Sequence, residues 1–198
     1  MKNIQLDVIR SFISIPCPKA VADFLKFELT RIKNRIPPQI VRWTPVEQWH
    51  LTLVFFGDVF ASELEKIQSA LTEACKGQKS FELKLGDFGA FPDWKKPKVL
   101  WIGLNGEIPK LLQLQTNIAS AVHNWIQKPE GRPFQAHLTV GRIKNVPDPG
   151  TCQKIQQRFS EINLKSSQPW IVSEVRLMKS ILSPAGAEHF VLYSVNLS

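Results

Sequence analysis

The sequence predicts an α+β fold of two pseudo-symmetric lobes, each with an antiparallel sheet and helices, that face one another across a central cleft. Residues 8–85 read as strand, helix, strand, helix and strand, and residues 97–180 repeat this order. Both segments open their second strand with His-Leu-Thr, at His50 and at His137. The helices after these strands share Lys-Ile-Gln and a final Glu at nearly the same offset. We therefore expect a single domain, residues 1–198, built by internal duplication.

In the first segment, strands are predicted where apolar residues alternate, and helices where they recur three and four positions apart. The strands are expected at residues 8–15, from His50 to a turn at Gly57-Asp58, and at 81–85. The helices are expected at residues 20–33 and 61–76. Ser62 is a plausible N-cap for the second helix because its hydroxyl can accept a hydrogen bond from the first turn.

The second segment follows the same pattern and continues into a C-terminal tail. Strands are expected at residues 99–104 and 134–143, and helices at 108–127 and 153–162. The tail should form two strands, at 171–179 and 190–195, around a turn at 183–188. Residues 86–98, rich in aromatic and basic side chains, and residues 128–133 are expected to be loops at the surface.

Composition limits the class of protein. The chain has 198 residues, of which 43% are hydrophobic, enough for a compact core. Its N-terminal segment interrupts apolar residues with polar ones and lacks the apolar run of a signal peptide, and no segment is apolar for long enough to span a bilayer. We expect a cytoplasmic monomer with no membrane partner. The excess of Lys+Arg (25) over Asp+Glu (17) favours a phosphate-bearing ligand.

Metal and disulfide sites are not expected. The three cysteines lie far apart and form no Cys-x-x-Cys pair, which argues against a disulfide framework and against a cysteine-rich zinc site. A zinc site on His50 and His137 would need a third ligand, and the motifs supply only a threonine beside each histidine. We therefore expect no metal and no cofactor.

The two His-Leu-Thr copies are the strongest functional signal. Residues two apart in a strand share a face, so each copy presents one imidazole and one hydroxyl on the same side: His50 with Thr52, and His137 with Thr139. One such pair is usually a half-exposed surface feature without a task. Two pairs at corresponding positions, in a chain with 4 histidines, are unlikely to arise by chance.

This set of groups suits phosphoryl chemistry without a metal. A neutral imidazole can take a proton from water while a protonated one gives a proton to the leaving oxygen. Histidine populates both states near neutral pH because its unperturbed pKa is about 6.5. Threonine hydroxyls can donate hydrogen bonds to the non-bridging oxygens. Two lobes related by a twofold axis would place acid and base on opposite sides of phosphorus, as in-line displacement requires.

These residues resemble the two-histidine (2H) phosphoesterases, and among them the bacterial and archaeal RNA 2′,3′-cyclic phosphodiesterases, formerly described as 2′-5′ RNA ligases. The resemblance covers nearly the whole chain. The matching motifs are Arg10-x-Phe12; Trp43-x3-Glu47-x2-His50-Leu-Thr52-Leu-x-Phe55-Phe56-Gly57; Phe88-Gly-x-Phe91-Pro92; Pro97-Lys98-Val99-Leu100-Trp101-x-Gly103; Phe134-x2-His137-Leu-Thr139-x2-Arg142; and Ser180-x-Leu182-x-Pro184-x-Gly186. Ala136, Lys98 and His189 stand where the family commonly has Pro, Arg and Tyr.

The resemblance implies metal-independent hydrolysis of 2′,3′-cyclic phosphate ends of RNA or oligonucleotides to 2′-phosphomonoesters. It implies His50 as general acid and His137 as general base, with the order less secure than the pair. It also implies that Arg142 contacts phosphate. Strand parity puts Arg142 on the face of Leu138, so this contact needs a bulge or a strand end after Gly141. Weak 2′-5′ ligation is expected as the reverse reaction, because the same proton transfers run backwards.

Three further side chains are candidates for substrate binding. Phe55 could stack on a base, as its family counterpart would, although by parity it is equally a core residue. Trp94 and Lys98 lie in the aromatic and basic loop, a composition suited to stacking on bases and to neutralising phosphates. The alternative is a loop whose aromatics anchor it on the core and whose lysines are solvated.

The sequence leaves one other class of function open, a binding module that holds a nucleotide or RNA end in the same cleft without turnover. Both histidines are intact, which favours the enzyme. Small cyclic nucleotides, tRNA halves and 2′-5′ oligonucleotides carry a similar phosphate, and the sequence does not choose between them.

Overall fold

The computed structural model describes residues 7–127, 131, 133–145, 147–183 and 186–198. Within these residues the chain forms nine strands and four α-helices, with short 3-10 helices between some of them. The strands are β1 (Val8–Pro16), β2 (Val41–Trp43), β3 (His50–Phe60), β4 (Phe81–Phe91), β5 (Val99–Gly106), β6 (His137–Ile143), β7 (Trp170–Val172), β8 (Glu174–Ser183) and β9 (Gly186–Asn196). The α-helices are α1 (Lys19–Lys33), α2 (Leu64–Cys75), α3 (Ile108–Ala121) and α4 (Pro149–Ser160). The predicted mixture of helices and antiparallel strands is confirmed.

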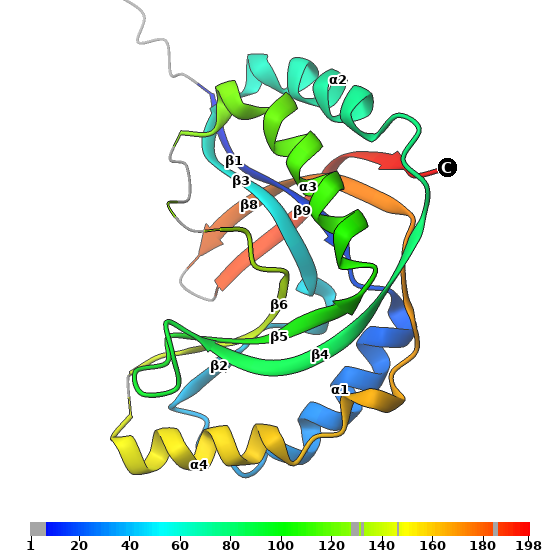
Figure 1. Ribbon diagram of the computed structural model, residues 1–198. Helices are drawn as coiled ribbons and strands as arrows, with labels where there is room; N and C mark the ends of the chain where they lie inside the picture. The colour runs from blue at the N-terminus through cyan, green and yellow to red at the C-terminus, as the bar shows by residue number, and fades with distance from the viewer. Residues whose placement is uncertain (1–6, 128–130, 132, 146, 184–185) are drawn as a thin grey trace, which may run out of the picture.

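The strands form one curled antiparallel sheet in the order β7-β4-β5-β6-β3-β1-β8-β9, and β2 pairs with β6 (Figure 1). The repeat in the sequence predicts a separate sheet in each lobe. Instead, β3 and β6 join the two ends of a continuous sheet through a single residue pair, Leu51 opposite Leu138. Both leucines are fully buried. The two His-Leu-Thr strands therefore meet at the centre of the fold.

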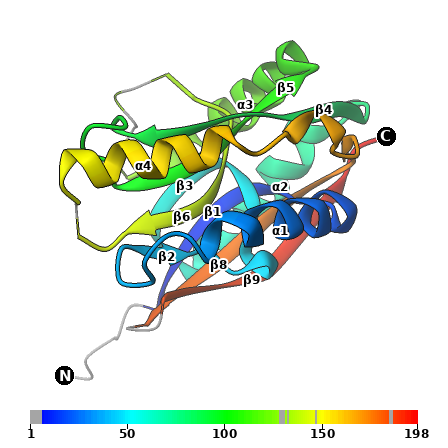
Figure 2. The same cartoon turned by 90° about the horizontal axis from the view of Figure 1, so that it is seen from below.

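The helices lie in two pairs at opposite ends of the molecule. α2 and α3 pack side by side at one end, and α1 and α4 lie at the other (Figures 1 and 2). Each pair combines one helix from residues 8–85 with one from residues 97–180. Each end of the molecule is thus built from both halves of the chain.

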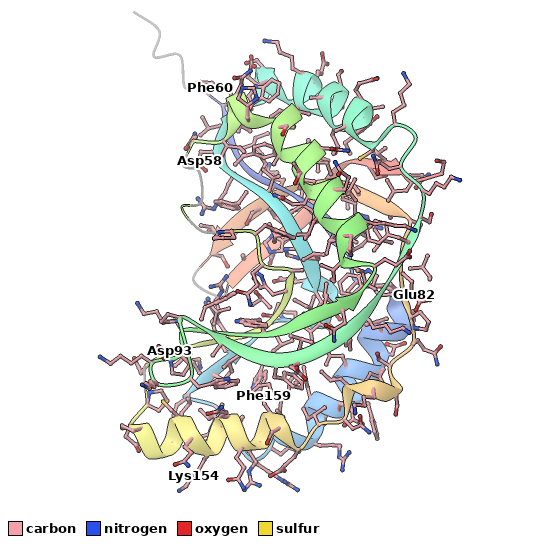
Figure 3. All side chains as sticks on the ribbon, viewed as in Figure 1. Asp58, Phe60, Glu82, Asp93, Lys154 and Phe159 are labelled. Carbon is pink, nitrogen blue, oxygen red and sulfur yellow. The ribbon has the colours of Figure 1, made fainter. Side chains whose placement is uncertain are left out.

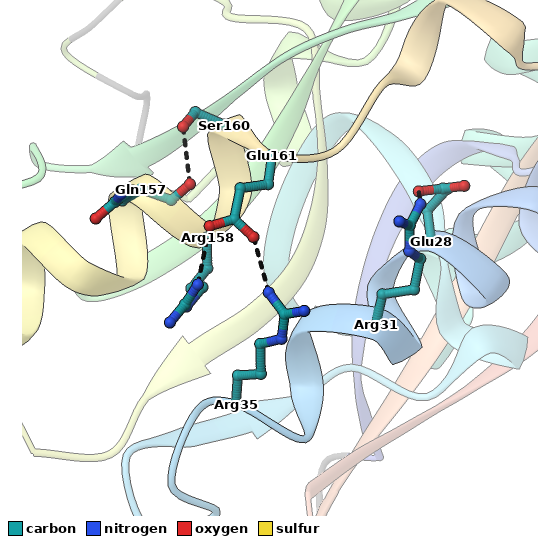
Figure 4. Close-up of polar contacts among 7 residues, drawn as sticks. All are labelled: Glu28, Arg31, Arg35, Gln157, Arg158, Ser160 and Glu161. Atoms are coloured by element: carbon teal, nitrogen blue, oxygen red, sulfur yellow. Dashed lines mark hydrogen bonds and ion pairs between the residues drawn. The ribbon is translucent and has the colours of Figure 1, made fainter.

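Apolar packing, more than ion pairing, holds α4 in place. Phe159 points from α4 toward β4 and β5 and is buried against Phe88, with 4.8 Å between ring centroids, whereas Lys154 points away into solvent (Figure 3). Glu161 at the end of α4 accepts hydrogen bonds from Arg35 and Arg158, each at 2.9 Å (Figure 4). These side chains are more than one third exposed, so each pair contributes at most about 1 kcal/mol.

Two strands run further than predicted because a glycine inside them does not end them. β3 continues through Gly57, whose φ of +82° lies in the left-handed region that glycine tolerates, and pairs with β1 up to Phe60. β4 continues through Gly86 to Phe91 with a register irregularity against β5. The predicted turn at Gly57-Asp58 was therefore wrong, and so was the first part of the predicted loop 86–98.

Helix and strand starts also differ from the prediction. α2 begins at Leu64 after a 3-10 turn, so Ser62 is not its N-cap. α3 ends at Ala121 rather than at residue 127, and β6 begins at His137 rather than at residue 134. α4 begins earlier than predicted, at Pro149, because the Asp148 carboxylate accepts a hydrogen bond from the Thr151 amide and proline suits the first helical turn.

The predicted tail strand at 171–179 is two strands. β7 pairs with β4 at one edge of the sheet, and β8 pairs with β1 toward the other edge. Only Ser173 separates them, so the periodicity of the sequence does not reveal the break. The predicted turn at 183–188 and the predicted loop at 128–133 lie partly outside the described residues. None of the helices in the described ranges is long and apolar enough to cross a membrane.

Candidate active site

A cleft of about 330 Å³ opens at the centre of the sheet, where β3 and β6 meet. Most of the side chains predicted from the sequence to form a site line this cleft. They are His50, Thr52, Phe55, His137, Thr139 and Arg142. The predicted residues Trp94 and Lys98 are not among the residues that line it.

The pairing of β3 with β6 arranges the two motifs around one point. Alternation turns the leucine of each His-Leu-Thr into the core and the histidine and threonine toward the cleft. Because the two leucines lie opposite one another in an antiparallel pair, the histidines that precede them lie on diagonal positions of that pair. Positions diagonal to one another across such a pair are about 7–8 Å apart. The imidazoles therefore stand diagonally across the β3–β6 pair, and both line the cleft.

Backbone carbonyls orient both imidazole rings in the same way. His50 Nδ1 lies 2.7 Å from the Gln48 carbonyl oxygen, and His137 Nδ1 lies 2.7 Å from the Gln135 carbonyl oxygen. A carbonyl only accepts, so Nδ1 carries the proton and donates it in each ring. In the neutral ring Nε2 is then the basic atom. The Thr52 hydroxyl donates to His50 Nε2 at 3.1 Å. Each motif thus presents Nε2 for proton transfer.

Aromatic and histidine rings enclose both imidazoles. Phe12 of β1 stacks on His50 with 4.8 Å between centroids, and His189 of β9 meets the His50 ring edge-on at 5.3 Å. On the other side, Phe91 meets the His137 ring edge-on at 5.0 Å. The stacked Phe12 ring covers one face of His50, and the edge-on contacts restrict rotation of both imidazoles.

The environment of His50 keeps it neutral. Burial lowers its pKa from 6.5 to about 4, the hydrogen bond to the Gln48 carbonyl raises it, and the nearby charges of His189 and His137 lower it. That the charge of His137 affects His50 agrees with the closeness of the two rings. Burial also lowers the pKa of His189, a third histidine in the cleft whose Nδ1 is buried without a hydrogen-bond partner.

A bulge in β6 turns Arg142 into the cleft. β5 residue Trp101 pairs with Thr139 whereas Leu100 pairs with Gly141, so Val140 is an extra residue on β6. This shift reverses the parity of the strand after Val140 and places Arg142 on the same face as Thr139. The bulge that the phosphate contact of Arg142 requires is therefore present. Burial, followed by the charge of Arg42, lowers the pKa of Arg142.

Bulges in β3 do the same for Phe55. The register between β1 and β3 shifts twice, leaving Leu53 and Phe56 as extra residues on β3. Phe55 therefore faces the cleft and is 40% exposed, whereas Phe56 is buried. The Arg10 guanidinium lies over the Phe55 ring, 4.8 Å from its centroid. Phe55 thus offers a flat apolar surface with a cation above one face.

Trp94 and Lys98 have other surroundings. Trp94 is partly buried against the core, and its ring centroid lies 5.9 Å from that of Phe159 on α4. Lys98 is exposed, and its backbone bonds to Phe91 and Ile143. The reason is the extra length of β4, which brings Phe91 beside His137 and leaves only residues 92–98 as the loop. Trp94 thus anchors the loop on the core, as in the alternative interpretation of this segment.

Several cleft residues were not predicted as part of the site. Arg10, Arg42 and His189 line it, and the carbonyls of Gln48 and Gln135 orient the rings. The sequence contains one signal for Gln48 and Gln135, since each motif histidine has a glutamine two positions earlier. Arg42 reaches the cleft through the pairing of β2 with β6, which its own sequence neighbourhood does not encode.

Sequence comparison finds one family and several curated relatives. The profile of the 2′-5′ RNA ligase superfamily matches residues 18–182. The RNA 2′,3′-cyclic phosphodiesterase of Aquifex aeolicus is 27% identical over 190 residues, 94% of this chain and 96% of that protein. The protein of the same name from Archaeoglobus fulgidus is 33% identical over 145 residues, 71% of this chain and 74% of that protein.

Solved structures share the fold. TT0787 of Thermus thermophilus superposes with a TM-score of 0.76 at 24% identity, covering 96% of this chain and 98% of that one. LigT of Escherichia coli complexed with 3′-AMP superposes with a TM-score of 0.73 at 23% identity, covering 97% of this chain and 99% of that one. At these identities the likeness concerns the fold.

Proposed function

Because the chain belongs to the 2′-5′ RNA ligase superfamily, we propose that it hydrolyses 2′,3′-cyclic phosphate ends of RNA or oligonucleotides to 2′-phosphomonoesters, without a metal ion or cofactor. The observation that carries the proposal is the pair of Nδ1-anchored imidazoles, His50 and His137, at opposite corners of one cleft. Relatives that match most of the chain are named RNA 2′,3′-cyclic phosphodiesterases, which supports the same reaction.

In the proposed reaction His137 Nε2 takes a proton from water, and the water oxygen forms a bond to phosphorus. The bond from phosphorus to the 3′ oxygen breaks, and His50 Nε2 gives that oxygen a proton. The 2′ ester bond stays, so the product is a 2′-phosphomonoester. Diagonal placement of the two rings supports an in-line path, because acid and base then approach phosphorus from opposite sides.

Thr52, Thr139 and Arg142 stabilise the charge on the phosphoryl oxygens. When His50 is protonated at Nε2 it no longer accepts from Thr52, which frees that hydroxyl to donate to a phosphoryl oxygen. The Arg142 guanidinium can donate two parallel hydrogen bonds to the same group. Phe55, with Arg10 above it, offers a surface for a nucleobase.

The acid role of His50 depends on substrate. In the empty cleft the low pKa of His50, about 4, keeps it neutral. A phosphodiester anion beside Nε2 favours the cation and raises the pKa of His50. Bound substrate therefore increases the fraction of His50 that carries the proton it donates. With a 5′ hydroxyl in place of water as the nucleophile, the same proton transfers would join a 2′,3′-cyclic end to that hydroxyl through a 2′-5′ bond. This is the weaker activity because water is the abundant competitor.

The internal duplication and its pseudo-twofold axis belong to this proposal. The pairing of Leu51 with Leu138, the residues that follow the motif histidines, supports an axis between β3 and β6. The combination of α1 with α4 and of α2 with α3 is what an exchange of corresponding helices would produce. We regard residues 1–198 as a single domain that duplicates approximately 8–85 in 97–180. A cytoplasmic monomer remains the expectation from the sequence.

Purified protein incubated with 2′,3′-cyclic AMP and EDTA tests the proposal. The expected product is 2′-AMP, identified by chromatography against 3′-AMP. His50→Ala and His137→Ala should each lower kcat/KM by about 100-fold or more, since general acid or base catalysis contributes about 10²–10⁴. His123→Ala, an exposed histidine outside the cleft, is the matched control. A requirement for added metal, or full activity in both cleft variants, refutes the mechanism. Tight binding without turnover would favour a binding module.

A further inference from the structure

Two arginines face one another at the far end of the cleft. Arg42 on β2 is paired directly opposite Arg142 on β6, and both line the cleft. Residues directly opposite in an antiparallel pair have Cβ atoms about 5 Å apart, and like charges in that position destabilise the pair. The arrangement is unfavourable until an anion lies close to the two guanidinium groups.

The protein itself supplies no such anion among its described residues. Neither guanidinium has an ion pair or side-chain hydrogen bond there, and none of the described residues lining the cleft is an aspartate or glutamate. The other arginines in the described part of the chain all lie within ion-pair distance of a carboxylate. They are Arg10, Arg31, Arg35, Arg158 and Arg176. Arg42 and Arg142 thus differ from the other described arginines because no carboxylate of the described residues compensates their positive charge.

The topology places this pair next to the imidazoles along one strand. β3 is paired with β6 at Leu138, and β2 pairs with β6 from Gly141 onward. The cleft therefore runs along β6 from the histidines to the two arginines. From Thr139 to Arg142 the strand advances three residues, one of them bulged, which is about 7–10 Å. Arg42 is paired with Arg142 and not with Thr139, so it lies farther along β6 from the imidazoles than the Thr139 hydroxyl does.

We propose that Arg42 binds a second phosphate, the one that joins the last two nucleotides of an RNA whose terminal cyclic phosphate lies between His50 and His137. This inference rests on the proposed function and narrows its substrate class. Arg142 serves the reacting phosphate and Arg42 serves the next one, so each guanidinium has its own anion. Oligonucleotides with an internal phosphate are then preferred over mononucleotide cyclic phosphates.

Three substrates separate the second phosphate from the second nucleoside. They are 2′,3′-cyclic AMP, an adenosine dinucleotide ending in a 2′,3′-cyclic phosphate, and the same dinucleotide with an uncharged methylphosphonate linkage. The wild-type protein should have a kcat/KM for the charged dinucleotide at least about tenfold above that for the uncharged one, since hydrogen bonds between charged groups contribute that much. Arg42→Gln should bring this ratio to within about twofold, whereas Arg35→Gln, which removes the same charge outside the cleft, should keep it.

The outcomes are distinguishable. Equal kcat/KM for the two dinucleotides in the wild type, or an unchanged ratio in Arg42→Gln, overturns the second phosphate site while leaving the proposed hydrolysis intact. Absence of hydrolysis of all three substrates refutes the proposed function instead, and equilibrium binding of the same two dinucleotides then gives the ratio that decides the site. Arg42→Gln should not impair folding, because the Arg42 side chain is exposed and has no ion pair among the described residues. The substitution should leave the Tm unchanged or raise it, since it removes a like charge opposite Arg142.

Discussion

Titration of His50 is the most direct test of the electrostatics in the cleft. The pKa of this ring falls from 6.5 to about 4, chiefly because it is buried. The difference corresponds to roughly 3 kcal/mol in favour of the neutral form, since each pKa unit is about 1.4 kcal/mol. At pH 7 only about one His50 ring in a thousand is then protonated in the empty protein. A bound phosphate at hydrogen-bond distance should raise the pKa by about one unit or more.

NMR measures both values. The imidazole signals of the 4 histidines are followed from pH 3.5 to 8, and the His50 signal is assigned by its loss in His50→Ala. Its midpoint should lie near pH 4 without ligand and higher with saturating 2′-AMP. The acid limb of kcat/KM, which reports the free enzyme, should also fall near pH 4 rather than near 6.5.

The low pKa of His50 also has a consequence for stability. Because the folded state holds His50 with a pKa below the unfolded value, it binds fewer protons between the two values. The stabilisation is therefore complete above about pH 6.5 and is lost as the pH falls toward about 4, by at most about 3 kcal/mol. His50→Ala should show a weaker dependence of unfolding free energy on pH in this range. In the NMR titration, a ligand-free midpoint of His50 at pH 6.5 or above refutes the role of burial. A midpoint that does not move when 2′-AMP binds refutes an anion site beside this ring.

Two substitutions test the packing that supports the site. A methyl group at Gly89 would lie 2.2 Å from the Trp101 ring. Gly89→Ala should therefore lower the free energy of unfolding by about 1–3 kcal/mol in chemical denaturation, and lower kcat because it displaces an aromatic neighbour of His137. An unchanged denaturation midpoint would show that the Trp101 ring moves freely. Leu138→Ala removes a fully buried side chain where β3 and β6 meet and should lower the free energy of unfolding by about 2–5 kcal/mol. The control Leu112→Ala, at an exposed position, should change it by no more than about 0.5 kcal/mol. Equal losses in the two variants would contradict the central place of Leu138.

Local pattern was sufficient for the kinds of element and for the faces of the two His-Leu-Thr segments. Alternation along a strand depends only on the chain itself, so it correctly put His50 and Thr52 on one face and Leu51 on the other. The same holds for helical spacing in α1 and α2, where most predicted apolar positions, such as Leu25 and Leu71, are buried. Phe24 and Leu64 are partly buried. Errors gathered at ends and at glycines, as at Gly57, because a residue with φ above zero can turn the chain or continue a strand as a bulge.

Long-range pairing decided what local pattern could not. The bulge at Val140 that turns Arg142 into the cleft exists only against β5, and the opposition of Arg142 to Arg42 exists only because β2 pairs with β6. The same reason separates Phe55, which faces the cleft, from Trp94, which packs on α4. By itself the sequence determined which side chains could do chemistry, since residue type and strand periodicity are properties of one segment. Only the tertiary structure decided which of them meet and how burial sets the pKa of His50, because both depend on contacts between segments far apart in the chain.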